Sequence, residues 1–354
     1  MEKKSVLYIM GIDWKWIYQR PQILAEMLGE DYDVTVVFPR FIWQRKLPSE
    51  MLGLHFYPLW KLPFQERVRL LARMSNWINR KIFADIQKYD CIYLGYPLYE
   101  RYISDTYQGK LVYDCMDNYE ALFPLRRSLD KLVACEEKVV KMCDVLVVSS
   151  ELLRRKMDRI AGFHKSILIR NGMFLKNVAE IKEPKKKRMY DICYIGTISS
   201  WFDRDAIKFS LKKNDNLRYQ LIGPYEDKIE DERICYHGPI EHGKLYETIK
   251  EYDCLVMPFK VNDIVEAVDP VKLYEYIAFG KCIISVYYAE IERFSDFVYF
   301  YRTEEEYIKL LDELGRKGFP PKYNKEQQEN FLNENTWEQR YKLLKSEIEK
   351  LEET

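Results

Sequence analysis

The sequence has no excess of charge of either sign, because 56 Lys and Arg residues balance 56 Asp and Glu residues. Binding to nucleic acid through phosphates needs a field of positive charge, so a nucleic-acid partner is a poor first hypothesis. The sequence also lacks an apolar run of 18 residues, and its first apolar stretch, 5–10, ends before Gly11 and Asp13. We therefore expect neither a signal peptide nor a transmembrane helix.

The eight cysteines include no C-x-x-C pair, and several of them lie within apolar, strand-like runs. This usage is typical of reduced core thiols and indicates a cytoplasmic protein. No group of His, Cys and Asp has the spacing of a metal site. The triplet "DYD" at 31–33 precedes a predicted strand, which is the wrong place for a metal-binding D-x-D. We expect no metal and no cofactor.

The sequence does contain enough apolar material for two domains, with 354 residues of which 47% are hydrophobic. Short apolar runs alternate with polar, helix-like segments, which is typical of parallel strands buried on both faces. The runs are 5–10, 33–38, 91–96, 110–116, 144–150 and 166–171, then 190–196, 218–223, 233–238, 252–259 and 281–286. The predicted fold class is α/β, with two Rossmann-like, doubly wound domains whose strand ends face a shared cleft.

The boundaries follow from changes in composition along the chain. Residues 174–190 carry a run of Lys and Arg, a Pro and little periodicity, which is typical of a linker. We therefore predict an N-terminal domain at 1–173 and a C-terminal domain at 191–330. In 331–354, Thr336 and Gln339 form a capping box ahead of an apolar helical stripe. We expect this helix to cross back and pack on the first domain.

The stretch "EAVDPVKLYEYIAFGKCIIS", 266–285, predicts a short helix with an anion site at its start. Asp269 suits an N-cap, Pro270 the first helical position and Gly280 the stop, which gives a helix over 270–279. The free N–H groups of Val271, Lys272 and Leu273, together with the Lys272 charge, would bind an anion.

Glu275 lies three residues after Lys272 and so projects from the same face of this helix. A carboxylate placed there can accept hydrogen bonds from two vicinal hydroxyls, as a ribose presents. A surface ion pair between Lys272 and Glu275 is the simpler alternative.

"DPVKLYEYIAFGKCIIS" resembles the donor-site signature of GT-B glycosyltransferases of the family-four type. Similar segments of that family match "YQRPQILAEML", "YDCMDNYE", "DVLVVSSELL", "IRNGM", "YIGTISSWFD", "YHGPIEHGKLYETIKEYDCLVMPF" and "TWEQRYKLL". The resemblance covers nearly the whole chain and lies nearest to the glycosyltransferases of teichuronic acid biosynthesis, with "QRPQ" and "GTISSWFD" the most telling pieces.

The resemblance implies a nucleotide sugar, with a UDP-sugar favoured, bound mostly by the second domain. It implies that Glu275 holds the ribose and that Lys272, with the amides of Val271 and Leu273, holds the diphosphate. The other donor-side candidates are backbone at Gly196 and Thr197, a second cation at Arg204, and a nucleotide pocket at Gly223, Pro224, His237 and Gly238. His237 is equally well explained as a packed residue at a strand end.

One position departs from the family pattern. The family has two Glu residues separated by seven positions, whereas Glu266 and Glu275 are separated by eight and the seven-spaced position is Ala267. The donor sugar, the base and the stereochemistry therefore stay open.

In the first domain, "GIDWKWIYQRPQ" joins the first strand to the first helix and places Trp14, Trp16 and Arg20 on the acceptor side. Asp117 follows a predicted strand and is the best carboxylate for deprotonating or orienting an acceptor hydroxyl. Asp13 is the second catalytic candidate, and Asp114, inside the strand run, is more simply structural.

The function implied is transfer of a sugar, of hexosyltransferase type, to a glycan or lipid-linked acceptor in cell-surface polysaccharide synthesis. A nucleotide-sugar epimerase of the same fold is one alternative, and a non-catalytic nucleotide-sugar-binding scaffold protein is another.

The segment 61–83 is basic and amphipathic, with six cations and one acid, Glu66. Val68, Leu71, Ile78 and Ile82 fit one helical stripe with Trp77 beside it, as in helices that lie on anionic membranes. A solvated basic face over a core stripe explains the pattern equally well. Peripheral contact with the inner face of the plasma membrane is the hypothesis.

Overall fold

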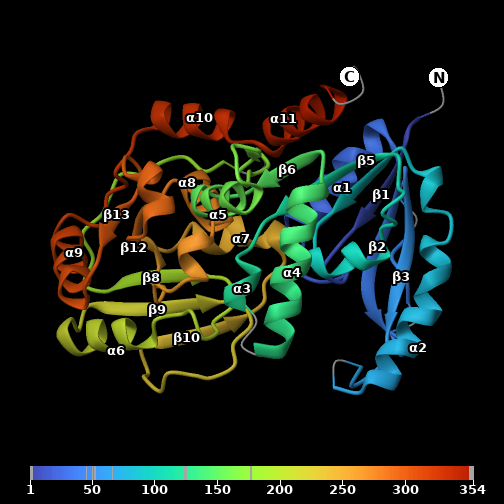
Figure 1. Cartoon of the computed structure of the whole chain (residues 1–354). Helices are drawn as coiled ribbons and strands as arrows, with labels where there is room; N and C mark the ends of the chain where they lie inside the picture. The colour runs from blue at the N-terminus through green and yellow to red at the C-terminus, as the bar shows by residue number, and fades with distance from the viewer. Residues whose placement is uncertain are drawn as a thin grey trace. The chain divides into compact units, whose positions relative to one another are not determined.

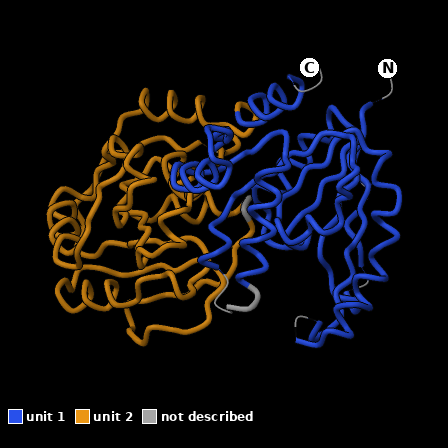
Figure 2. Tube along the Cα trace, in the orientation of Figure 1, with its two compact units in different colours: residues 1–170, 340–354 blue, residues 171–339 orange. Residues whose placement is uncertain are grey.

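The computed structural model describes residues 3–44, 46–49, 51, 53–65, 67–122, 126–175 and 178–350. The chain forms two compact units, unit 1 with residues 1–170 and 340–354 and unit 2 with residues 171–339 (Figure 2). Each unit is built on one parallel β-sheet, and each is described by itself below.

Unit 1 has a seven-stranded parallel sheet in the order β3-β2-β1-β4-β5-β6-β7 (Figure 1). The strands are β1 Ser5–Ile9, β2 Asp33–Phe41, β3 Leu54–Lys61, β4 Cys91–Leu94, β5 Lys110–Cys115, β6 Val145–Val148 and β7 Ser166–Leu168. The helices are α1 Arg20–Asp31, α2 Arg69–Asn79, α3 Tyr119–Leu122, α4 Arg126–Met142 and α5 Glu151–Ala161, with 3₁₀ turns at Arg80–Phe83, Ile86–Lys88 and Pro97–Tyr102. Chain order runs outward in both directions from β1 and β4, so the switch point of this sheet lies between those strands.

Unit 2 has a six-stranded parallel sheet in the order β10-β9-β8-β11-β12-β13. The strands are β8 Tyr190–Ile195, β9 Leu217–Ile222, β10 Ile234–Gly238, β11 Cys254–Met257, β12 Cys282–Val286 and β13 Tyr299–Tyr301. The helices are α6 Arg204–Lys213, α7 His242–Ile249, α8 Val271–Ala278, α9 Glu304–Arg316 and α10 Lys325–Glu334, with 3₁₀ turns at Val265–Ala267 and Ala289–Phe294. The last helix, α11 Trp337–Lys350, begins in unit 2 and continues in unit 1. Its switch point lies between β8 and β11, and ligands of such sheets bind there, outside the carboxyl ends of the strands.

The α/β class with two Rossmann-like sheets is confirmed, and two edge strands are additions to the prediction. β3 carries Pro58 in its middle, which weakens its strand signal, and an edge strand tolerates a Pro because it has one unpaired side. β13 has only three residues, too few for a hydrophobic pattern to stand out.

The C-terminal helix predicted to begin at the Thr336 capping box is α11, and a separate helix, α10, precedes it. α10 ends at Glu334, and the N–H of Gln339 donates to Thr336 Oγ1 at 3.2 Å at the start of α11. The residues of α11 from 340 onward belong to unit 1, where Tyr341 donates to Asp31 at 2.6 Å and Lys345 pairs with the same carboxylate at 2.8 Å. Leu351 lies outside the described residues.

The segment 61–83 is not one continuous helix. α2 covers only Arg69–Asn79, and the 3₁₀ turn follows it. Leu71 and Ile82 are partly buried whereas Val68 and Ile78 are exposed, so the predicted stripe of these four residues is wrong. Glu66 lies outside the described residues. No helix in the part of the chain that the structure describes combines the length and the hydropathy needed to cross a bilayer.

Candidate functional site

Helix α8 begins beside the switch point of unit 2, one residue later than predicted. Pro270 has an extended conformation and occupies the cap position, and the Asp269 side chain makes no cap hydrogen bond. The N–H of Leu273 donates to the Pro270 carbonyl at 3.1 Å, so the prediction that this amide binds an anion is wrong. Among the described contacts, the N–H groups of Val271 and Lys272 have no acceptor, and both remain candidates for an anion.

The Lys272 side chain lies against Gly196, directly after β8. A β-carbon built on Gly196 would lie 2.3 Å from Lys272 Cε and 2.9 Å from its Nζ, and Gly196 has φ +138°. The Lys272 Nζ lies 6.0 Å from the centre of the Tyr194 ring and 5.7 Å from that of Phe259. Only a glycine permits this close approach of the Lys272 side chain to the backbone at residue 196.

Burial lowers the pKa of Lys272, and the nearby negative charge of Glu275 opposes that shift in part. Among the residues that the structure describes, no carboxylate lies within ion-pair distance of this ammonium. A buried ammonium that faces aromatic rings but no described carboxylate, beside two amides without an acceptor among the described contacts, is an arrangement that a bound anion would stabilise.

Backbone contacts hold this edge of the sheet together. The Gly196 N–H donates to the Ile222 carbonyl at 2.8 Å, and the Gly223 N–H donates to the Gly238 carbonyl at 2.8 Å. A β-carbon at Gly223 would lie 2.2 Å from the Gly196 carbonyl oxygen. Gly223 and Gly238 therefore support the loop of Gly196 through their own backbone. Thr197 accepts at its carbonyl from the Tyr194 hydroxyl at 3.0 Å.

Two contacts that fix α8 carried no signal in the sequence. The Ile195 N–H donates to the Tyr276 hydroxyl at 3.0 Å, which ties the helix to the end of β8. The buried carboxylate of Asp269 accepts from the Asn171 N–H at 2.6 Å and forms an ion pair with Arg293. Asn171 and Arg293 lie 98 and 24 residues from Asp269, beyond the reach of any local pattern, whereas the Tyr274 hydroxyl, which donates to the same carboxylate at 3.0 Å, comes from α8 itself.

Glu275 is partly buried one turn into α8, on the same face as Lys272. Glu266 is exposed on the 3₁₀ turn Val265–Ala267, and Ala267 is fully buried. The position that carries the first family glutamate therefore has no carboxylate, and its side chain is part of the core.

Three further donor-side candidates are occupied or peripheral. The Arg204 guanidinium donates to the carbonyls of Ser199 at 3.0 Å and Ile198 at 3.2 Å, which orders the loop after β8. His237, the last residue but one of β10, contacts Gln220 Oε1 on the neighbouring strand β9 at 2.7 Å. Pro224 is exposed, and its carbonyl accepts from the Ile198 N–H at 2.8 Å.

Arg20 is buried in unit 1, so its predicted place on the acceptor side is wrong. Its guanidinium binds both carboxylate oxygens of Asp114 at 2.9 Å and donates to the Ile169 carbonyl at 2.8 Å. Asp114 also accepts from the Tyr93 hydroxyl at 2.8 Å. All three side chains are buried, and a buried charge is tolerated when it is paired in this way.

Asp117 lies just after β5 and is partly buried. Burial and the negative charge of Asp114 raise the pKa of Asp117 to about 6, and Arg20 opposes the shift. A carboxylate with a pKa of about 6 is a competent base near neutral pH. Asp13, in contrast, is paired with Arg40 at 3.1 Å and accepts from the Lys15 N–H at 2.7 Å, so its charge is already compensated.

The two candidate tryptophans differ in exposure. Trp14 is partly buried and packs edge to face on Phe56 with ring centres 4.7 Å apart. Trp16 is 64% exposed, in the segment between β1 and α1, and is the one free to contact a ligand.

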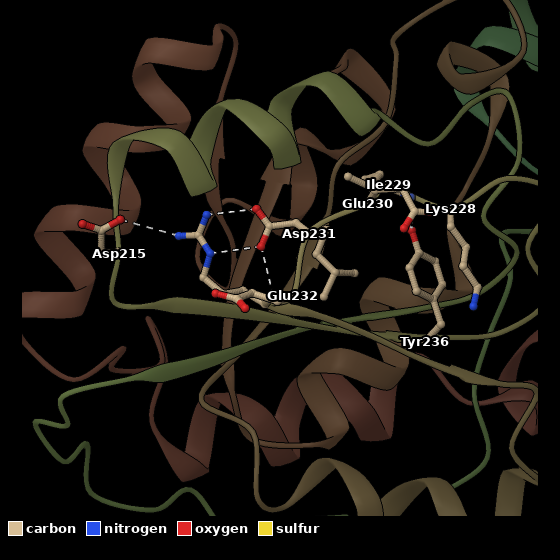
Figure 3. A pocket seen from close by; sticks show the side chains of 9 residues that line it. Asp215, Lys228, Ile229, Glu230, Asp231, Glu232 and Tyr236 are labelled. Atoms are coloured by element: carbon tan, nitrogen blue, oxygen red, sulfur yellow. Dashed lines mark hydrogen bonds and ion pairs between the residues drawn. The ribbon is translucent and has the colours of Figure 1, made fainter.

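A hollow of about 870 Å³ lies elsewhere in unit 2, lined by the loop that joins β9 to β10, by the start of β10 and by Asp215 (Figure 3). Among its charged side chains, Arg233 pairs with Asp231 at 3.0 Å and with Asp215 at 3.7 Å. Neither Lys272 nor Gly196 lines it. Among the described residues, no group of three or more His, Cys, Asp or Glu side chains is placed to hold a metal ion.

Two doubly wound parallel sheets, with a cationic helix start at the switch point of the second, define the class: the chain has the GT-B fold of glycosyltransferases. The solved HepE of Anabaena, with UDP and glucose, is similar at a TM-score of 0.70 and 10% identity over 98% of this chain and 100% of that one. The galactosyltransferase WaaB of the lipopolysaccharide outer core is similar at 0.67 and 10% identity over 97% of this chain and 99% of that one.

In sequence, the chain is 23% identical over 215 residues to TuaH of Bacillus subtilis (strain 168), a protein named as a glycosyltransferase of teichuronic acid biosynthesis. The match covers 54% of this chain and 53% of TuaH, so it spans about half of that relative. No family model matches the sequence.

Proposed function

We propose that this protein is a glycosyltransferase that moves a sugar from a nucleotide donor, with a UDP-sugar favoured, to a glycan or lipid-linked acceptor in cell-surface polysaccharide synthesis. The observation that carries the proposal is the unpaired Lys272 ammonium against Gly196, beside the two free amides that begin α8. An epimerase or a scaffold protein finds no specific support, since the relatives are named as glycosyltransferases.

In this proposal, the donor diphosphate binds the Lys272 ammonium and the N–H groups of Val271 and Lys272. The departing diphosphate gains negative charge in the transition state, and a fixed cation in a dry site stabilises that charge. Glu275, one turn along, accepts from the ribose hydroxyls. Because protein groups supply the positive charge, we propose that transfer does not depend on a metal.

The acceptor binds unit 1 in this proposal, with Asp117 deprotonating or orienting its hydroxyl. The raised pKa supports Asp117 over Asp13, which Arg40 already compensates. A lipid-linked acceptor would place the enzyme at the cytoplasmic face of the plasma membrane.

The first experiment is a titration with UDP, GDP and dTDP by calorimetry, followed by transfer and hydrolysis assays with the matching sugars, with and without EDTA. We expect UDP to bind and EDTA to have no effect. Turnover of a UDP-sugar that produces no altered sugar nucleotide would separate transfer from epimerisation, and binding without turnover would favour the scaffold alternative.

The second experiment removes the Glu275 carboxylate, which is proposed to bind the ribose hydroxyls. Glu275→Ala should weaken UDP binding about tenfold or more, because hydrogen bonds to a charged group contribute about 1.5–3 kcal/mol. The matched control is Glu329→Ala on α10, whose carboxylate only meets the exposed Lys325 at 3.6 Å. Unchanged UDP affinity in Glu275→Ala would refute the donor assignment.

A further inference from the structure

Exposed apolar side chains are concentrated in one part of unit 1, between Phe41 and Ile78. They come from the end of β2 and the loop after it, from β3, from the loop after β3 and from α2. They are Phe41, Ile42, Trp43, Leu47, Met51, Tyr57, Phe64, Val68, Leu70, Met74, Trp77 and Ile78. Isolated exposed apolar residues need no explanation, but such a concentration in one stretch of the chain points to an interaction surface.

Helix α2 buries polar side chains and exposes apolar ones, the reverse of an ordinary surface helix. Its fully buried side chains are the polar Ser75 and Asn79, whereas Leu70, Met74 and Trp77 are 65%, 48% and 72% exposed. These three residues are spaced by four and three, so they form one stripe along the outside of the helix. The apolar face of α2 therefore has no partner among the described residues.

The polar inner face of α2 has a structural cause at the edge of the sheet. β3 is the last strand of its sheet, so one side of its backbone lacks a neighbouring strand. Asn79 Oδ1 accepts from the Trp60 N–H at 2.9 Å, and Ser75 donates to the Trp60 carbonyl at 2.8 Å. These contacts pair the backbone of Trp60 at the free edge of β3, and they fix which face of α2 turns outward.

The apolar stripe is flanked by cations. Arg69 and Arg73 each precede a residue of the stripe by one position, which places them about 100° round the helix from it. The exposed cations of this region are Arg67, Arg69, Arg73, Arg80 and Lys81. Among the residues that the structure describes, none of these five forms an ion pair with a carboxylate. Their charge is thus available to an anionic partner.

The loop that leads into α2 contains an exposed phenylalanine, Phe64, in the left-handed backbone conformation. Phe64 has φ +58°, and its side chain is 69% exposed. A left-handed conformation is unfavourable for a residue with a β-carbon and persists only where surrounding contacts hold it. The N–H groups of Arg67 and Val68 both donate to the Phe64 carbonyl at 2.9 Å, which holds the turn.

A second loop lies beside this one. The Ile42 N–H donates to the Lys61 carbonyl at 3.3 Å, and the Phe41 and Trp43 rings stack with centres 4.5 Å apart. Arg40 donates to the Gln44 carbonyl at 2.6 Å, so the loop is held in place although Trp43 is exposed. The exposed aromatic rings are thus presented by ordered backbone.

We propose that this docking surface, made of the outer stripe of α2, Phe64, Trp43 and the flanking cations, binds the interface of an anionic lipid bilayer. Trp and Phe side chains favour the headgroup boundary, and each nearby cation adds attraction to anionic lipid. α2 has eleven residues, too few to span a bilayer, so it lies on the membrane. The inference rests on the proposed function, because it says where the enzyme would meet a lipid-linked acceptor.

The test is flotation of the full-length protein with vesicles of phosphatidylcholine alone or mixed equally with phosphatidylglycerol. We expect binding only to the anionic vesicles, a blue shift of tryptophan fluorescence, and weakening by salt. The triple variant Arg67→Glu, Arg69→Glu, Arg73→Glu and the separate triple variant Leu70→Ser, Met74→Ser, Trp77→Ser should each weaken binding about tenfold or more. Their exposed side chains make loss of folding a small risk, which circular dichroism checks.

The controls change the same chemistry elsewhere. Lys208→Glu with Lys212→Glu alters exposed cations on α6, and Phe163→Ser removes an exposed ring after α5. Both controls should bind vesicles as the wild type does. UDP affinity, measured on every variant, should stay unchanged, so failure of the membrane inference and failure of the donor assignment are distinguishable.

No binding to anionic vesicles would overturn the proposal, as would binding that both surface variants retain. Self-association of the wild type that the apolar variant abolishes, without vesicle binding, would mean that a second copy of the chain covers the stripe, which also overturns it.

Discussion

The Lys272 side chain fills the space that any side chain at residue 196 would need. A β-carbon on Gly196 would lie 2.3 Å from Lys272 Cε, which is closer than nonbonded atoms approach. The two residues come from the loop after β8 and from the start of α8, so their contact joins the two elements on either side of the switch point. The glycine thus lets the Lys272 side chain pack directly against the backbone of residue 196.

Gly196→Ala should therefore damage donor binding as well as stability. The φ of +138° costs an alanine about 1–2 kcal/mol, and the methyl group also displaces the Lys272 amine. We expect UDP affinity to fall at least about tenfold, measured by calorimetry, and the thermal midpoint to fall as well.

The matched control is Gly162→Ala. Gly162 ends α5 with φ +84°, and no atom lies within 4 Å of the place that an alanine methyl group would take, so this substitution has a backbone cost without a clash. Its variant should lose stability and keep UDP affinity. Equal UDP affinity in both variants would argue against a role for the Gly196 and Lys272 contact.

Lys272→Met should change stability and binding in opposite directions. Burial lowers the pKa of Lys272, so the ammonium is less favourable in the folded protein than in the unfolded chain. Removing that charge should leave the unliganded protein as stable as the wild type or more so, and should weaken UDP binding. Thermal melts with and without UDP measure both effects, and a loss of stability with unchanged affinity would contradict the prediction.

The pH dependence of UDP binding has a sign that follows from the same shift. The pKa of Lys272 lies below the ordinary value of 10.5, so in the wild type affinity should fall as pH rises toward that value and the ammonium loses its proton. Lys272→Met should show a flatter alkaline limb.

The sequence was informative where physical constraints are local. Buried parallel strands need continuous apolar runs, and these placed β1, β2, β4, β5 and most strands of unit 2 close to their observed bounds. Lys272 and Glu275 could be placed on one face because helical spacing does not depend on the rest of the fold.

The sequence was uninformative where a partner lies far along the chain. Asp269 suits an N-cap by residue type, but Asn171 and Arg293 engage its carboxylate instead. Arg20 stood in a strand-to-helix segment, where a ligand contact was plausible, but Asp114 holds it 94 residues away. The stripe on α2 was misassigned because a helical pattern identifies side chains that share a face but does not say which face is exposed. The contacts of Asn79 with the free edge of β3 determine which face is exposed.

Arg20→Met should destabilise the protein strongly. It leaves Asp114 charged and buried with only the Tyr93 hydroxyl, and removing one partner of a buried ion pair costs about 3–5 kcal/mol. The control Lys345→Ala breaks an ion pair near the surface with Asp31 and should cost less than about 1 kcal/mol. Urea unfolding measures both, and UDP affinity should be the same in the two folded variants. A stable Arg20→Met protein with impaired transfer would instead restore Arg20 to the acceptor side.

Asp117→Asn should stabilise the folded protein and impair transfer, because the same raised pKa governs both properties. The pKa is about 6 in the folded state against 3.8 for an ordinary aspartate carboxyl, so between these values the folded state binds the proton more tightly. Stability of the wild type should fall as pH rises from about 4 to 6, by at most about 3 kcal/mol, and Asn removes this loss. The two proteins should therefore differ most in stability above pH 6 and converge near pH 4.

For transfer, the wild-type rate should decline below about pH 6 as the Asp117 carboxylate becomes protonated. Asp117→Asn should lower the rate about 10²-fold or more, and its remaining rate should show no such decline at acid pH. A pH profile of transfer with saturating donor, alongside urea unfolding at each pH, measures both; a variant that keeps the acid limb would assign it to another group.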